Sequence, residues 1–125
     1  MKTLKIGIAT YEDFKARTLA IAKGELKPNG DDPKIWFESL ESMAQILSVK
    51  NRELLHVIRD KEPKSLTELA EMVSRDKGNL SRTLKTMQQH GLIDMRPSGE
   101  GKELMPIVPY ELLKLDYDLF VSHPK

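Results

Sequence analysis

The chain has 125 residues, which fits one domain, and its 39% hydrophobic and 31% charged residues are the proportions of an ordinary folded protein. It contains no cysteine, which excludes disulfides, thiolate metal ligands and a thiol nucleophile. The formal net charge is +1, so bulk charge does not indicate a polyanionic partner. Its apolar stretches are too short to span a bilayer and the N-terminus lacks a secretory signal, so we expect a cytoplasmic protein with no membrane partner.

The N-terminal segment predicts a strand followed by a helix. Residues 3–8 alternate between apolar and polar side chains, which is the period of a half-buried strand. Thr10 begins a helix as its N-cap, and Gly24 ends it. Residues 24–34 contain several strong turn formers and predict a loop.

Two helices follow a short apolar stretch, Ile-Trp-Phe, at residues 35–37. Ser39 caps the first of them, and its apolar residues share one face. The second begins near Ser48 and ends between Lys61 and Pro63, because proline disfavours helical geometry in the residue before it.

Residues 65–91 predict two helices joined by a tight turn. Ser65 and Glu68 form a capping box at the start of the first helix. The turn lies at Ser74 and Arg75. The second helix, residues 76–90, is capped by Asp76 and ended by the glycine that follows, and its core face is formed by Leu80, Leu84 and Met87.

The opposite face of helix 76–90 is polar and basic and has no acidic residue. A helical wheel places Gly78, Ser81, Arg82, Lys85 and Gln89 on it. Residues 75–102 as a whole have six basic and three acidic side chains. Such a face suits a major groove, which needs cations for phosphates and guanine and short polar groups for other base edges. The alternative is an ordinary solvated helix face, although such faces usually mix charges of both signs.

Residues 92–108 predict a hairpin around the sequence PSGEGK. Arg96 and Lys102 flank its tip, from which they would reach a minor groove or a phosphate. A solvent-exposed hairpin with incidental charges is an equally good interpretation. At the C-terminus, Leu115, Tyr117 and Leu119 alternate with charged residues and predict another half-buried strand, with a helix continuing from Tyr110 as the alternative.

The stretch ELAEMVSRDKGNLSRTLKTMQQHGLI, with the hairpin after it, resembles the winged helix-turn-helix of MarR-type and ArsR-type regulators. The segments KIGI, EDFKART and WFESLESMAQILSVKNRELL are similar to a narrower group of small predicted DNA-binding proteins of archaea and bacteria. The resemblance implies a dimeric regulator, in some cases encoded beside a toxin-like partner. The chain departs from the common pattern where Ser74 replaces a glycine and Arg75 replaces a small apolar residue.

We therefore expect an α+β, mainly α, fold in three segments. Residues 1–34 form a strand-helix extension for dimerisation, residues 35–108 a winged helix-turn-helix, and residues 109–125 a C-terminal strand or tail. The resemblance places the recognition positions on Lys77, Gly78, Asn79, Ser81, Arg82 and Lys85. Further candidate DNA contacts are Arg75, Arg96 and Lys102.

The expected function is sequence-specific binding of double-stranded DNA by a transcriptional regulator that acts as a repressor. Autoregulatory or antitoxin-like action is a further option. The two lone terminal strands would leave exposed edges, so we expect a homodimer in which they pair across a two-fold axis. The alternative is that both ends fold back on their own subunit.

Other classes of function have less support in the sequence. We find no nucleophile, acid-base pair or metal cluster, and His56, His90 and His123 have no ligand spacing, so we expect neither an enzyme nor a cofactor or metal site. His90 lies at the end of its helix, where a cation would suit the helix dipole. A winged helix that binds another protein is the main alternative, and sensing of a small ligand near aromatic residues such as Trp36 remains open.

Overall fold

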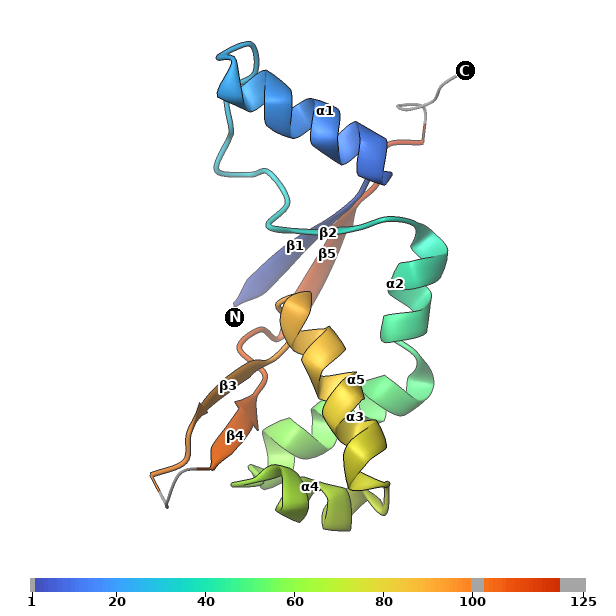
Figure 1. The fold of residues 1–125 in the computed structure, drawn as a ribbon, viewed down its shortest axis with the longest axis vertical. Coiled ribbons are helices and arrows are strands. Elements are labelled where there is room, and N and C mark those ends of the chain that lie inside the picture. The colour runs from blue at the N-terminus through green and yellow to red at the C-terminus, as the bar shows by residue number, and fades with distance from the viewer. Residues whose placement is uncertain (1, 100–102, 120–125) are drawn as a thin grey trace.

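The computed structural model describes residues 2–99 and 103–119. Within these residues the chain forms an α+β fold of five helices and five strands (Figure 1). The helices are α1 (Tyr11–Ala22), α2 (Leu40–Ile46), α3 (Val49–Lys61), α4 (Leu66–Val73) and α5 (Lys77–Gln89). The strands are β1 (Thr3–Ile8), β2 (Ile35–Phe37), β3 (Asp94–Pro97), β4 (Leu104–Ile107) and β5 (Leu112–Asp116).

Local capping explains where the helices begin. In each helix the residue before the first turn accepts a hydrogen bond from a backbone N–H three residues further on, which satisfies a donor that has no partner inside the helix. The accepting side chains are those of Thr10, Ser39, Ser48, Ser65 and Asp76. The predicted caps Thr10, Ser39, Ser65 and Asp76 are confirmed, and the helix expected to begin near Ser48 is capped by that residue.

Three strands that lie far apart in the sequence form one parallel sheet in the order β2-β1-β5. β1 is the central strand, with Ile6 beside Ile35 of β2 on one side and beside Leu115 of β5 on the other. The sequence predicted β1 but not its position between two parallel neighbours, and it did not identify residues 35–37 as a strand. That pairing depends on contacts between residues remote in sequence, which a local pattern does not contain.

The C-terminal strand differs from its prediction in place and in burial. A C-terminal strand is present, but it covers residues 112–116 instead of lying within the expected residues 114–120, and its five residues are exposed, so the expected half-burial was wrong. The helical alternative from Tyr110 is also absent. Hydrogen bonds from the backbone N–H groups of Glu111 and Leu112 to the Lys2 carbonyl set the start of β5.

The pairing of β1 with β5 takes place within one chain. This is the alternative in which both ends fold back on their own subunit, so pairing of the terminal strands across a two-fold axis is not needed to cover the edges of β1. The reason first given for a dimer therefore no longer holds for β1, and the homodimer itself stays a prediction.

One hydrophobic core joins the sheet to α3, α4 and α5. Its buried members come from β1, β2, the three helices and the segment after α5: Leu4, Ile6, Phe37, Leu54, Ile58, Leu69, Leu80, Leu84, Met87, Leu92 and Ile93. By contrast, α1 has no buried residue. The predicted segments 1–34, 35–108 and 109–125 thus share one sheet, and the first two share one core.

The antiparallel strands β3 and β4 form a hairpin that projects beside α4, at the end of the molecule opposite α1 (Figure 1). β4 contacts both α3 and α4, and α4 packs against α5. The predicted order of helix, turn, helix and hairpin is therefore present. None of the helices in residues 2–99 and 103–119 combines the length and the apolar composition that a membrane crossing requires.

Candidate nucleic-acid interface

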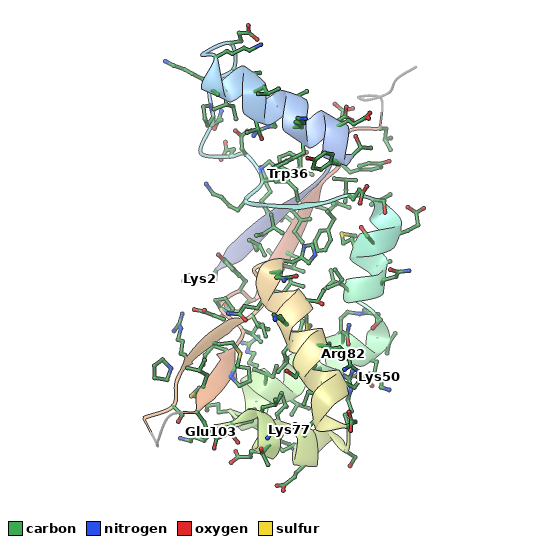
Figure 2. All side chains as sticks on the ribbon, viewed as in Figure 1. Lys2, Trp36, Lys50, Lys77, Arg82 and Glu103 are labelled. Carbon is green, nitrogen blue, oxygen red and sulfur yellow. The ribbon has the colours of Figure 1, made fainter. Side chains whose placement is uncertain are left out.

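The helix α5 is anchored on one side and open on the other. Leu80, Leu84 and Met87 are buried in the core. The predicted recognition residues are all exposed: Lys77, Gly78, Asn79, Ser81, Arg82 and Lys85. Figure 2 shows Lys77 and Arg82 on α5, with Lys77 in its first turn. A rigid helix therefore presents a polar surface to solvent.

The charge on this surface has one sign. Residues 77–89 contain Lys77, Arg82 and Lys85 and no acidic residue. None of these three cations takes part in an ion pair within the described residues, where the pairs are Arg17–Asp32 and Arg96–Asp94. Unpaired cations on an exposed helix face are available to phosphate oxygens and guanine edges.

The turn between α4 and α5 has the left-handed geometry that glycine adopts most easily. Ser74 has φ 55° and ψ 46°, and its N–H donates to the Ala70 carbonyl. The serine therefore occupies the conformation expected of the glycine that it replaces, at some cost in backbone strain.

Arg75 points back onto α5 rather than into solvent. Its Nη2 donates to Oδ1 of Asn79 at 3.2 Å and to Oγ1 of Thr83 at 3.5 Å. Its Nη1 is buried without a hydrogen-bond partner among the described residues. The guanidinium thus orients Asn79, and contact between Arg75 and a phosphate stays a prediction.

The N-terminal end of the α5 surface contains an acid that the sequence analysis treated only as a cap. Asp76 is exposed, and its Oδ2 accepts a hydrogen bond from the Asn79 N–H at 2.9 Å. The same oxygen would lie 3.2 Å from a Cβ added to Gly78. A carboxylate there repels phosphate, so the part of the helix that best suits a polyanion runs from Ser81 to Lys85.

The hairpin is less basic than the helix. The Arg96 Nε donates to Oδ2 of Asp94 at 3.1 Å, in a solvent-exposed ion pair. Lys102 lies outside the described residues, and the exposed acid Glu103 directly precedes the return strand β4 (Figure 2). Of the two predicted hairpin contacts, the structure therefore places only Arg96, with a carboxylate beside it.

An aromatic groove lies between α1 and the end of α5, at residues near which the sequence left the sensing of a small ligand open without locating a groove. It has a volume of about 400 Å³, and its lining includes Tyr11, Phe14, Trp36, Phe37 and His90. The rings of Phe14 and Trp36 lie 5.9 Å apart, and Trp36 lies between α1 and the sheet in Figure 2. The signal available in the sequence was the aromatic content of residues 11–14 and 35–37.

His90 closes this groove on the α5 side. Its ring stacks on Phe37 with centroids 4.3 Å apart, and burial lowers its pKa below the usual 6.5. Burial disfavours the charged imidazolium, so at neutral pH the ring is neutral. The burial of His90 therefore opposes the favourable interaction of a cation with the helix dipole at this end of α5.

The described residues contain no group of three or more His, Cys, Asp or Glu side chains placed to hold a metal ion. The arrangement instead offers an exposed polar and cationic helix, a hairpin beside the helix pair, and a separate aromatic groove.

Comparison with known proteins gives one match. A search of curated proteins and a search of solved structures each found no match. The family model HVO_A0114 matches residues 46–115, which run from the last residue of α2 almost to the end of β5 and make up more than half of the chain. The chain therefore belongs to the HVO_A0114 family.

Proposed function

We propose that the protein binds double-stranded DNA sequence-specifically as a transcriptional regulator, with α4, α5 and the β3–β4 hairpin acting as a winged helix-turn-helix. α5 enters the major groove, and the hairpin lies along the adjacent groove or backbone. The observation that carries the proposal is the exposed face of α5. It has short polar groups and three cations that form no ion pair with the described residues. Residues 77–89 contain no acid, and the helix is held by three buried side chains.

The roles of the α5 residues follow from their chemistry. Arg82 has the planar donor geometry that reads guanine, and it lies in the middle of the exposed face, away from Asp76. Lys85 is one turn further on and suits a phosphate as a point charge. Asn79, whose Oδ1 already accepts from Arg75, keeps its amide NH₂ for a base acceptor.

The proposal is tested by measuring the affinity of the full chain for duplex DNA from the region directly upstream of its own gene, at several salt concentrations. Arg82→Ala should cost about 1 to 3 kcal/mol of binding free energy and relax base preference at one position. Lys85→Ala should weaken binding to all duplexes alike and lower the slope of log affinity against log salt by about 1.

Lys15→Ala is the matched control, because Lys15 is an exposed lysine on α1, outside the proposed interface. It should leave affinity unchanged. Full affinity in the Arg82→Ala variant would contradict the proposal. An interaction whose strength does not depend on salt would favour the alternative of a protein-binding module, because a phosphate interface weakens steeply as salt rises.

A further inference from the structure

The edge strand β5 exposes an unusual amount of apolar surface. Leu112, Leu113 and Leu115 are 41%, 36% and 46% exposed, and Tyr117 just beyond the strand is 43% exposed. Within residues 2–99 and 103–119, β5 pairs with β1 on one edge and with no strand on the other. An unpaired, leucine-rich strand edge favours addition of another strand.

The two faces of β5 differ in chemistry. Parallel neighbours point their side chains to the same side of a sheet, so Leu113 and Leu115 share the side of their register partners Leu4 and Ile6, which are buried in the core. The other side of β5 includes Lys114, whose register partner on β1 is Lys5. Lys114 therefore has a like charge beside it, and it has no ion pair within the described residues.

We propose that the outer edge of β5 pairs antiparallel with β5 of a second copy of the chain, centred on Leu115, to form a continuous six-stranded sheet. This register places Leu115 opposite its own counterpart in the second copy. It also places Lys114 of each copy opposite Asp116 of the other, once on each side of the axis. These contacts supply the counter-charge that Lys114 lacks among the described residues of its own chain.

Other registers fit the strand less well. Centring the pair on Lys114 puts the two lysines opposite one another, and centring it on Leu113 puts Glu111 opposite Leu115. Like charges that face each other across a pair of strands are destabilising. A slip of one residue would turn the apolar sides of the two copies to opposite faces of the joined sheet.

A groove beside β5 fits the same register. It has a volume of about 280 Å³, and the apolar part of its lining includes Leu47, Leu55, Val108 and Leu113. With Leu115 at the centre, Tyr117 of each copy lies opposite Leu113 of the other, at this groove. The contact is thus isologous, with an aromatic ring from each copy available to cover exposed leucine in the other.

The proposal concerns the oligomeric state alone and does not depend on DNA binding. The experiment is sedimentation equilibrium of the full chain over a range of micromolar concentrations. The wild type should be a dimer. Leu115→Lys should abolish the dimer, because it places two cations at the centre of the pair, while circular dichroism should show an intact fold because Leu115 is half exposed.

A charge exchange provides the sharper test. Lys114→Glu alone and Asp116→Lys alone each create two like-charge contacts, so each should raise the dissociation constant roughly tenfold. The double variant Lys114→Glu with Asp116→Lys again pairs opposite charges, now with the acid at 114 and the lysine at 116. It should return the dissociation constant of the dimer to near the wild-type value. Lys15→Glu on α1 is the control of equal charge change and should leave it unaltered.

Three results would overturn the proposal. The first is a wild-type chain that stays monomeric throughout the concentration range. The second is a Leu115→Lys variant that remains dimeric, and the third is a double charge exchange that is no better than the single changes. Because sedimentation is measured without DNA, these outcomes are independent of the test of DNA binding.

Discussion

The helices α1 and α5 are nearly equal in length, with 12 and 13 residues, but they are held in different ways. α5 buries three side chains in the core, whereas α1 buries none and is tied to the sheet by contacts at its surface. The guanidinium of Arg17 lies 5.3 Å from the Trp36 ring and forms an ion pair with Asp32 at 2.7 Å. Surface ion pairs contribute little free energy, so α5 is the fixed element and α1 the weakly attached one.

The largest expected effect tests this difference directly. Leu80→Ala in α5 should lower the free energy of unfolding by about 2 to 5 kcal/mol, because it leaves a cavity at a fully buried position. Leu19→Ala in α1, where the side chain is 50% exposed, should cost less than about 1 kcal/mol. Urea denaturation of both variants measures the two values. Equal losses would show that α1 is held as firmly as α5.

A smaller effect is expected in the turn between α4 and α5. Ser74→Gly should raise the free energy of unfolding by about 0.5 to 1 kcal/mol, because glycine adopts the left-handed conformation of residue 74 without the strain that serine has there. Ser81→Gly, at an exposed position inside α5, should instead lower it by about 0.5 to 1 kcal/mol. The melting temperatures of the two variants should shift in opposite directions. A Ser74→Gly variant less stable than the wild type would show that Ser74 is not strained.

The smallest effect concerns the end of α5, where His90 stacks on Phe37. The folded state lowers the pKa of His90 below 6.5, so the unfolded chain binds more protons as the pH falls through and below 6.5. Stability should therefore decrease in this window, and the decrease should be smaller in a His90→Phe variant, which keeps an aromatic ring against Phe37. Identical pH profiles of the unfolding free energy for the two proteins would contradict this coupling.

The helices of this chain could be predicted because their determinants are local. A cap and the N–H that it satisfies lie three residues apart, as in Ser65 and Glu68, and the buried side of α5 follows from the spacing of Leu80, Leu84 and Met87. The exposed candidate residues on α5 follow from the same periodicity, because a residue on the opposite side of a packed helix faces solvent.

The surroundings of those residues could not be predicted in the same way. The side chain of Arg75 turns onto Asn79 and Thr83, and neither helical periodicity nor charge specifies that direction. The environment of His90 depends on its stacking against Phe37, more than fifty residues earlier in the chain. Alternation alone placed the C-terminal strand within residues 114–120, because the alternating pattern runs from Leu113 to Leu119 and does not mark where pairing with β1 begins or ends.

The sequence by itself determined the helix positions, the acid-free face of α5 and the hairpin, because each depends on neighbours within a few residues. Only the tertiary structure decided the sheet order β2-β1-β5 and the register that pairs Thr3 with Leu112. A parallel pair needs two segments remote in sequence to meet side by side, and the free energy that selects their register comes from burying Leu4 and Ile6 against the whole core.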